Sequence, residues 1–231
     1  MKKVFDGKKA VIVGGTGGIG LSILRSLAAE GSEVRAIGRH ALDGVDSLIL
    51  ELDNPENRNI VLDEVLSADI LCIVRGPFLQ KHLHEMTSDE WLSQAYSNLA
   101  FPGMLVSAAL PHMRASLWGR ILLFGGTRTD SVRGFRTNAA YAAAKTGLSS
   151  LVKSVALEYT LEGITCNAIC PGFVETEYLD SVQKDNLAAK NPDGKLISTQ
   201  EIADLAVFLL KNTLYNGLIV PADKGWAPGL I

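Results

Sequence analysis

VIVGGTGGIG, residues 11–20, joins an apolar run to five glycines in seven positions, and it decides the fold of this chain. Glycine inside a regular element costs conformational entropy, so this density needs a specific reason. The run VIV is typical of a buried strand, and LSILRSLAAE, residues 21–30, has the periodicity of an amphipathic helix. Glycines between them let a ligand approach backbone N–H groups at the helix N-terminus. The stretch predicts a strand, a phosphate-binding turn and a helix; a glycine turn without a ligand is the alternative.

Apolar, β-rich runs alternate with helical patterns along the rest of the chain. Because these runs are continuous rather than alternating, they predict strands buried on both faces of a parallel sheet. We expect an α/β fold, a doubly wound domain over residues 1–231 with seven mostly parallel strands and helices on both faces. The expected strands are VIV at 11, VRAI at 34, LILEL at 48, ILCIV at 70, ILLF at 121, ITCNAIC at 164 and GLIV at 217. The expected helices are 19–30, 55–66, 88–117, 139–161 and 199–211.

The connection between the second and third expected strands is unusual. GRHALDGVDS, residues 38–47, has two glycines and no helical stripe. Parallel neighbours normally need a crossover of about a dozen residues, usually a helix. We expect a bare loop here and a less covered part of the sheet.

Composition argues against several classes of protein. The net charge is −3 and the basic residues are scattered, which argues against a nucleic-acid partner. The apolar stretch 99–112 contains two prolines and is shorter than the ~20 residues of a membrane span. Cys72, Cys166 and Cys170 lie in apolar runs without a matching Cys/His set, so we expect buried reduced thiols, no metal site and a cytoplasmic protein.

The glycine loop fits three phosphate-binding spacings. Gly15, Gly17 and Gly20 give G-x-G-x-x-G, Gly14 with Gly17 and Gly20 gives G-x-x-G-x-x-G, and Gly14 with Gly18 and Gly20 gives G-x-x-x-G-x-G. The loop alone leaves these registers open.

The residues at the end of the second expected strand indicate which group the cofactor carries at the 2′ position of its ribose. NAD-binding units place Asp or Glu there for the 2′-hydroxyl. Here Gly38 stands at that position and Arg39 follows it. Because an arginine suits a 2′-phosphate, we expect NADP(H) to be favoured over NAD(H); a solvated surface arginine is the alternative.

YAAAK, residues 141–145, places Tyr141 and Lys145 on one face of a helix. A tyrosine with a pKa near 10 is a poor acid–base group at neutral pH. An ammonium group one turn away stabilises the phenolate and lowers that pKa, which allows proton exchange with an alcohol or carbonyl.

With these motifs the chain resembles the short-chain dehydrogenase/reductase family, specifically the short single-domain branch that includes the 3-oxoacyl-[acyl-carrier-protein] reductases. The resemblance covers about residues 8–226 and selects the register Gly14, Gly18 and Gly20. It rests on the order of VIVGGTGGIG, Asp53-Asn54, Asn98 in YSNLAFPGM, GRILLFG, YAAAKTGL, NAICPGFVET at 167–176 and DKGW at 223–226.

The resemblance implies a Rossmann-type domain with an integral substrate pocket and a role for each matching residue. Tyr141 would be the acid–base group, Lys145 would bind the nicotinamide ribose, and Asn98 would kink its helix and hold a water. Asp53 would meet the adenine. The remaining implied cofactor contacts are Thr16, Gly17, Gly18, Ile19, Gly20, Gly76, Pro171, Gly172, Val174 and Thr176.

The chain departs from the family at two places. The family's N-N-A-G is replaced by IVRG, residues 73–76, where only Gly76 survives. No serine stands at the family's catalytic serine position, which is Gly126 when aligned from GRILLFG and Arg128 when counted back from Tyr141. Thr127 is the nearest hydroxyl that could polarise a substrate oxygen, with Thr129 and Ser131 as alternatives.

We expect an NADP(H)-dependent oxidoreductase that exchanges hydride between nicotinamide and a small carbonyl compound or secondary alcohol. The alternatives are a nucleotide-binding regulatory or structural protein with degraded catalysis and, less favoured, an epimerase or dehydratase. By resemblance we expect a homodimer or homotetramer formed through the two long helices. The short polar segment between Thr176 and Ser198 indicates an open substrate pocket.

Overall fold

Seven strands form one sheet in the order β3-β2-β1-β4-β5-β6-β9 in the computed structural model, which describes residues 3–226. All neighbouring pairs are parallel, so the predicted doubly wound α/β class is confirmed and the described sheet has no antiparallel member. The strands are β1 Lys9–Val13, β2 Glu33–Gly38, β3 Asp46–Ile49, β4 Ile70–Ile73, β5 Gly119–Phe124, β6 Ile164–Pro171 and β9 Ile219–Ala222. A separate parallel pair consists of β7 Val174–Glu175 and β8 Ile197–Ser198.

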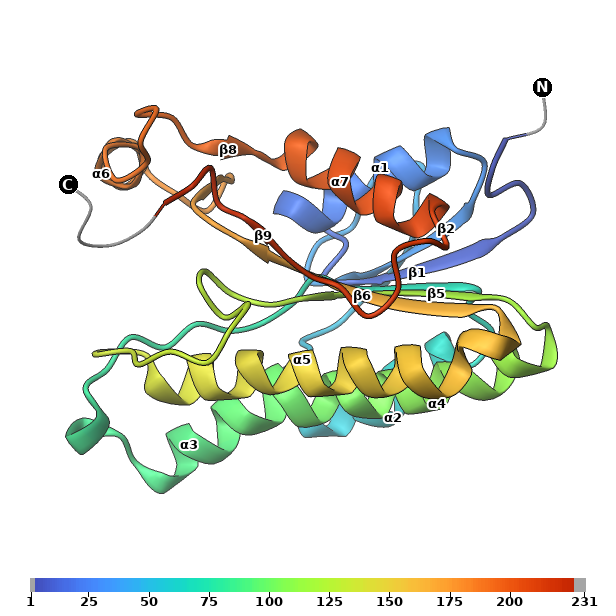
Figure 1. Cartoon of the computed structure of the whole chain (residues 1–231), viewed down its shortest axis with the longest axis horizontal. Helices are drawn as coiled ribbons and strands as arrows, with labels where there is room; N and C mark the ends of the chain where they lie inside the picture. The colour runs from blue at the N-terminus through green and yellow to red at the C-terminus, as the bar shows by residue number, and fades with distance from the viewer. Residues whose placement is uncertain (1–2, 227–231) are drawn as a thin grey trace.

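Helices cover both faces of the sheet (Figure 1). One layer holds α1 and α7, which pack against each other, and the opposite layer holds α2, α4 and α5, with α3 at its end. The helices are α1 Gly18–Ala29, α2 Arg58–Val65, α3 Ser88–Ala95, α4 Phe101–Ala115, α5 Ala139–Tyr159, α6 Ser181–Ala188 and α7 Thr199–Lys211.

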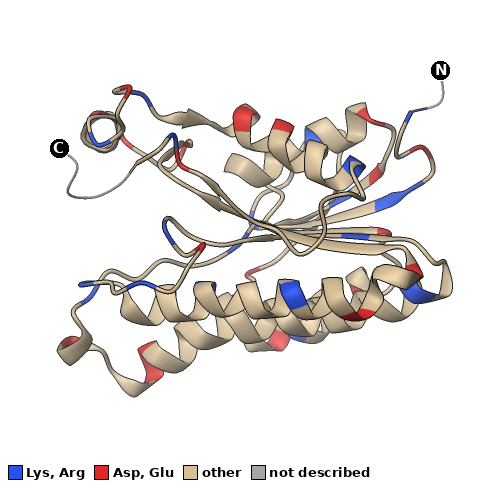
Figure 2. Cartoon of the chain, viewed as in Figure 1, with Lys and Arg blue, Asp and Glu red and all other residues tan. Residues whose placement is uncertain are grey.

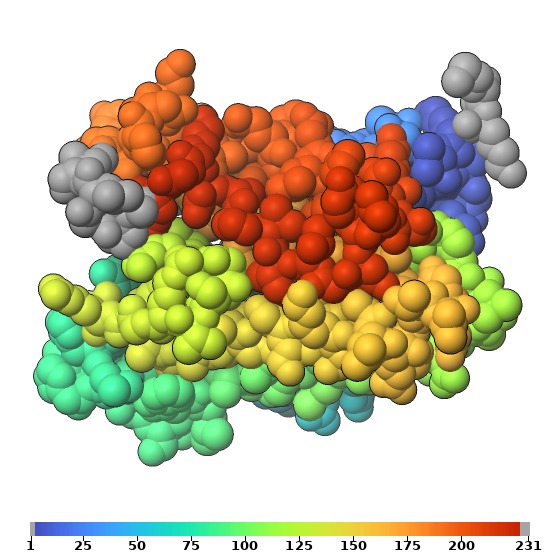
Figure 3. All heavy atoms as spheres, in the orientation of Figure 1, coloured from blue at the N-terminus to red at the C-terminus, as the bar shows by residue number. Residues whose placement is uncertain are grey.

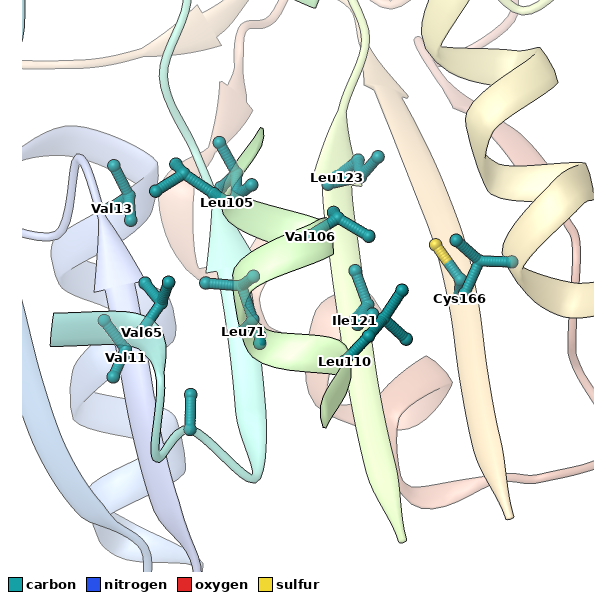
Figure 4. Close-up of a cluster of buried hydrophobic side chains, with 14 of the residues drawn as sticks. Val11, Val13, Val65, Leu71, Leu105, Val106, Leu110, Ile121, Leu123 and Cys166 are labelled. Atoms are coloured by element: carbon teal, nitrogen blue, oxygen red, sulfur yellow. The ribbon is translucent and has the colours of Figure 1, made fainter. Parts of the chain in front are cut away.

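The core consists of two hydrophobic clusters, one on each face of the sheet. Successive strand residues point to opposite faces, so Val11 and Val13 enter one cluster while Ile12 enters the other. Figure 4 shows the first cluster, in which Val13 and Leu123 lie beneath side chains of α4. Burial on both faces explains the continuous apolar runs of the sequence.

Two elements differ from the sequence-based prediction. Strand β3 covers Asp46–Ile49 rather than the whole of residues 48–52, and it is only partly buried because the bare loop before it leaves this edge uncovered. A short helix, α6, forms in the polar segment 177–198, where the sequence indicated no helix. An Asp180 capping box starts it: the Asp180 carboxylate accepts from the Gln183 N–H, and Gln183 returns a bond to the Asp180 N–H.

The helix predicted over 88–117 forms as α3 and α4 joined by a π-helical turn, Tyr96–Ala100. A π-helical turn widens the helix by one residue and is frequent at functional sites. This turn contains Asn98, where the sequence predicts a kink.

The three cysteines are buried free thiols, as predicted. In the described part of the chain, no helix is long and apolar enough to cross a membrane. Residues 3–226 also hold no group of three or more His, Cys, Asp or Glu side chains suited to a metal ion.

Candidate functional site

A cavity of about 380 Å³ opens at the carboxyl ends of β1, β2 and β4. The chain order of the sheet reverses between β1 and β4, and open α/β sheets bind ligands at such a switch point. Most of the predicted cofactor contacts line this one cavity: Gly14, Thr16, Gly17, Gly18, Ile19, Gly20, Arg39, Asp53, Gly76 and Thr176.

The glycine loop is shaped by close backbone contacts. Gly14 has φ +86°, and a Cβ there would lie 2.9 Å from the carbonyl oxygen of Val74, the residue that follows the neighbouring strand β4. A Cβ on Gly20 would collide with the Gly14 carbonyl, where α1 packs against the end of β1. These contacts account for glycine at both positions, and they bring the backbone N–H groups at the start of α1 to the cavity, where such groups can bind an anion.

Arg39 lies at the rim of the cavity with its side chain exposed. Its backbone N–H donates to Thr16 Oγ1 at 3.1 Å. A Cβ on Gly38 would collide with the Thr16 side chain, so Thr16 fills the space that a ribose-binding carboxylate would need. The rim of the second strand therefore presents a cation and no acid at these two positions.

Asp53 and Arg75 form an ion pair inside the cavity. Ser97 Oγ also donates to Asp53 Oδ1 at 3.0 Å. Partial burial raises the pKa of Asp53, but the hydrogen bond and charge of Arg75 together with the Ser97 bond outweigh it, and the net pKa is lowered. Arg75 Nη1 is buried and has no partner among the described residues, so one edge of the guanidinium remains free to bind.

Lys145 and Asn98 meet at Gly76. A Cβ on Gly76 would lie 2.5 Å from both Lys145 Nζ and Asn98 Oδ1, which explains why only glycine fits there. Lys145 Nζ donates to the carbonyl oxygens of Arg75 at 2.9 Å and Phe124 at 2.8 Å, which uses two of its three N–H groups.

The π-helical turn brings Asn98 into this centre. Its Nδ2 donates to the Pro77 carbonyl at 3.1 Å and to Gln94 Oε1 at 3.2 Å. Asn98 Oδ1 is buried without a partner among the described residues and can accept a further hydrogen bond.

Burial sets the protonation of the Tyr141 and Lys145 pair on α5. Desolvation, opposed by Cys170 and aided by the positive charge of Arg75, lowers the pKa of Lys145 to about 7. Desolvation, helped by Cys170, raises the pKa of Tyr141 above its usual range, so the prediction that Lys145 lowers this pKa is wrong for the cofactor-free chain. In this structure Tyr141 is therefore a neutral phenol, a proton donor, while Lys145 is close to its titration point at neutral pH.

The end of β6 and the segment after it contain four predicted cofactor contacts: Pro171, Gly172, Val174 and Thr176. Gly172 N–H donates to Ala222 O at 2.9 Å on the neighbouring strand β9. Val174 and Thr176 follow in and after β7, and Thr176 lines the cofactor cavity. Pro171, Gly172 and Val174 are not part of that cavity wall.

Comparison with known proteins agrees with this geometry. The family model described as Enoyl-(Acyl carrier protein) reductase matches residues 59–227. The chain belongs to the short-chain dehydrogenase/reductase family.

It is 32% identical over 222 residues to the 3-oxoacyl-[acyl-carrier-protein] reductase of Escherichia coli, covering 89% of this chain and 90% of the relative. It is 29% identical to the D-beta-hydroxybutyrate dehydrogenase of Rhizobium meliloti over 95% and 98% of the two chains. A solved structure called short chain dehydrogenase/reductase family protein superposes with a TM-score of 0.86 at 26% identity, over 97% of this chain and 98% of that one.

Gly126 lies next to the hydroxyl of Tyr141. A Cβ added to Gly126 would lie 2.6 Å from the Tyr141 hydroxyl oxygen. Apart from Gly126 and its two chain neighbours, no residue has an atom closer to that Cβ position. Of the two alignments left open by the sequence, the one from GRILLFG therefore describes the space next to Tyr141.

The three candidate hydroxyls have different surroundings. Thr127 lines a cavity together with Tyr141, and its Oγ1 donates to the Pro171 carbonyl at 3.0 Å. Thr129 is buried and bonded to the N–H and C=O of Gly126 at 2.8 and 3.0 Å. Ser131 is exposed and lines neither this cavity nor the cofactor cavity. Thr127 alone remains placed to reach a substrate, and its catalytic role stays a prediction.

A second cavity, of about 270 Å³, contains Tyr141. Its walls include four further aromatic side chains, Phe78, Phe135, Phe173 and Trp226. The Phe78 ring meets the Tyr141 ring edge-on at a centroid distance of 5.1 Å. In the space-filling view the loop after β5 and the segment after β9 border one face of the molecule (Figure 3). No local sequence pattern groups these aromatic residues, because they come from four separate loops.

Glu177 and Tyr178 cover the glycine loop. Glu177 Oε1 accepts from the Gly18 N–H at 2.8 Å, so a carboxylate of the chain occupies an N–H group at the start of α1. A Cβ on Gly17 would collide with the Tyr178 hydroxyl. Neither residue was predicted from the sequence, because the contact between Gly18 and Glu177 joins positions 159 residues apart and no local pattern indicates it.

Proposed function

We propose that this short-chain dehydrogenase/reductase is an NADP(H)-dependent oxidoreductase that interconverts a small carbonyl compound and its secondary alcohol. The observation that carries the proposal is the position of α5 between the two cavities. Tyr141 lies in the wall of the 270 Å³ cavity, while Lys145, one turn further, reaches Gly76 in the wall of the 380 Å³ cavity. A proton donor and a cofactor-side cation are thus held on one rigid helix.

The residues of the larger cavity fit a dinucleotide. The crowded glycine loop offers backbone N–H groups for a pyrophosphate, and two buried polar atoms beside it, Arg75 Nη1 and Asn98 Oδ1, lack partners among the described residues. Lys145 keeps one N–H group free for a ribose hydroxyl. Asp53, already paired with Arg75, would face the adenine end of the cavity.

When bound, the nicotinamide would supply or accept the hydride, and side chains of this protein would donate or accept the proton. In the reducing direction the Tyr141 phenol donates its proton to the carbonyl oxygen, and the charge of Lys145 stabilises the phenolate that remains. Asn98 Oδ1 can accept a hydrogen bond from a water molecule, and this water would return a proton to Tyr141 and Lys145. Thr127, in the same cavity as Tyr141, is the proposed donor to the substrate oxygen once it releases the Pro171 carbonyl.

The cofactor preference rests on Arg39. Its exposed guanidinium stands at the rim beside the position of the ribose-binding acid, and Thr16 leaves no room for a carboxylate at Gly38. A guanidinium forms charge-assisted hydrogen bonds with a 2′-phosphate, and NADH has no such group to offer it.

Two specific observations favour a second function, a nucleotide-binding regulatory protein with degraded catalysis. Gly126 removes the serine of the family from beside Tyr141, and IVRG at 73–76 removes its asparagines. Such a protein would bind nucleotide without needing the Tyr141 proton.

Reduction of carbonyl compounds by the Tyr141→Phe variant tests the proposed function. With NADPH and a panel of small ketones, we expect wild-type turnover and at least a 100-fold lower kcat for the variant, because general acid catalysis contributes about 10²–10⁴-fold. Tyr159→Phe, at the far end of the same helix, is the control. Equal rates for Tyr141→Phe and wild type would contradict the proposal, and nucleotide binding without reduction of any ketone would favour the regulatory alternative.

Assembly and location are further parts of the proposal. The names of the relatives point to carbonyl or alcohol substrates, and family members commonly associate through the two long helices, here α4 and α5. We propose a homodimer or homotetramer formed through the predicted helix 88–117, which is α3 and α4 in the structure, and through α5. Three buried free thiols fit the reducing conditions of the cytoplasm.

A further inference from the structure

Arg128 extends into the aromatic cavity that contains Tyr141. Arg128 lies in the loop between β5 and α5, two positions after Gly126, the residue next to the Tyr141 hydroxyl. Its backbone has φ +63°, in the left-handed region that residues with a Cβ rarely adopt. Strained positions of this kind concentrate at functional sites, where the surrounding structure holds them.

Two aromatic rings border the Arg128 guanidinium. Its central carbon lies 5.9 Å from the ring centroid of Phe135 and 5.9 Å from that of Trp226. Both distances are within the ~6 Å range of cation–π attraction. The rings hold the charged group without using its N–H donors for strong hydrogen bonds.

No carboxylate of residues 3–226 forms an ion pair with Arg128, although acids lie nearby. Asp130 pairs with Arg133 at 3.2 Å, and Asp223 accepts the Gly225 N–H at 3.0 Å. Lys190 adds a second positive charge, with its Nζ 5.5 Å from the centroid of Phe173. In Figure 2 the loop after β5 carries basic positions in blue and an acidic position in red, on the side of the molecule where the described chain ends. The cavity therefore has an apolar wall and an unused planar cation.

We propose that the substrate of this protein carries a free carboxylate, which Arg128 binds through two N–H groups while the aromatic rings enclose the apolar part of the molecule. A guanidinium and a carboxylate match in geometry and form paired hydrogen bonds. This rests on the proposed function. In the reducing direction the keto acid gains a hydride from the nicotinamide at its carbonyl carbon and a proton from Tyr141 at its oxygen, and a hydroxy acid leaves. A substrate presented as a neutral thioester has no group for Arg128.

The test compares acids with their neutral esters. Phenylglyoxylate and 4-oxo-4-phenylbutanoate place the carboxylate at two distances from the ketone, and their methyl esters keep the ring and the ketone without the charge. We expect kcat/KM of at least one acid to exceed that of its ester tenfold or more in the wild type. Arg128→Gln should lower kcat/KM for that acid 10- to 100-fold and leave the ester within threefold. Arg128→Lys should recover part of the loss.

Arg136→Gln is the matched control, since Arg136 is exposed in the same loop and lines none of the cavities described above. Equal losses for the acid in the two Gln variants would overturn the proposal, because they would indicate a general effect of loop charge. A wild-type preference for the ester, or for a neutral 3-oxoacyl thioester of N-acetylcysteamine, would overturn it as well.

A binding measurement separates this proposal from the proposed function. Benzoate and the neutral benzamide have similar shapes, and Trp226 in the cavity wall can report either by fluorescence. We expect benzoate to bind at least tenfold more tightly than benzamide, and Arg128→Gln to remove the difference. This result would support the carboxylate site even for a chain that reduces no ketone. Equal binding of the two compounds by the wild type would overturn the site even for an active reductase.

Discussion

Single residues in this site are explained by the atoms that crowd them. Gly76 survives from the family's N-N-A-G because Lys145 Nζ and Asn98 Oδ1 both lie where its Cβ would be. Gly38 stands where an acid is expected because Thr16 fills the space. Neither contact can be read from the sequence, since each joins positions far apart in the chain. The types of chemistry could be predicted from the sequence, but which side chains exclude one another could not.

Lys145 makes the stability of the cofactor-free protein depend on pH. Burial lowers its folded pKa from 10.5 to about 7. Below pH 7 the lysine is protonated in both folded and unfolded chains, but between about 7 and 10 only the unfolded chain holds this proton. Raising the pH through this range therefore favours the folded state, by up to about 1.4 kcal/mol per pH unit.

Urea unfolding of the wild type and Lys145→Met at pH 6.0, 7.5 and 9.0 measures this effect. We expect the wild type to gain about 2 kcal/mol relative to the variant between pH 7.5 and 9.0, and about half as much or less between 6.0 and 7.5. A difference that stays constant across all three values would show that Lys145 keeps an ordinary pKa.

At the scale of elements, strongly periodic segments were predictable and contacts between them were not. Helix α7 covers the predicted range, because its apolar face and the Ser198 capping box act locally. Strand β3 is shorter than predicted, because its apolar run lies at an uncovered sheet edge. The segment from β7 to α6 shows the limit most clearly: its sequence looks like a polar loop, yet its Glu177 reaches the start of α1.

This contact predicts that Glu177 competes with the cofactor. Its carboxylate uses the Gly18 N–H and places a negative charge at the helix N-terminus, where a pyrophosphate would bind. We expect Glu177→Gln to bind NADPH about 2- to 10-fold more tightly than the wild type in a calorimetric titration, as a helix-terminus charge is worth about 0.3–1 kcal/mol and more when partly buried.

Glu175→Gln is the control, because Glu175 pairs with Lys184 and does not line the cofactor cavity. Weaker NADPH binding by Glu177→Gln, with Glu175→Gln unchanged, would instead show that Glu177 supports the loop.

At the scale of the whole molecule, the order of motifs predicted the architecture, because alternating buried strands and amphipathic helices pack stably in few ways. Surfaces were harder to predict. Large apolar side chains are exposed on several elements, among them Leu92 of α3 and Leu157 of α5, at 68% and 87% exposure. Exposed apolar side chains on these two helices are expected of a chain that associates through them.

Light scattering tests the association. We expect a mass of two or four times the 24.8 kDa chain, and a lower mass for Leu157→Glu, whose exposure means that folding should be unaffected. Val4→Glu, at an exposed site next to the end of α1 in the opposite layer, should keep the wild-type mass. A monomeric wild type would contradict the proposed assembly.

The most direct test of the account is a paired titration of the purified protein with NADPH and NADH, repeated with Arg39→Ala and with the surface control Arg25→Ala. The glycine loop, Arg75 and Arg39 together predict that the wild type binds NADPH at least tenfold more tightly than NADH, that Arg39→Ala loses most of this preference, and that Arg25→Ala keeps it. Binding of neither nucleotide would contradict the central claim, because it would mean that IVRG at 73–76 and the Glu177 contact have closed the dinucleotide site.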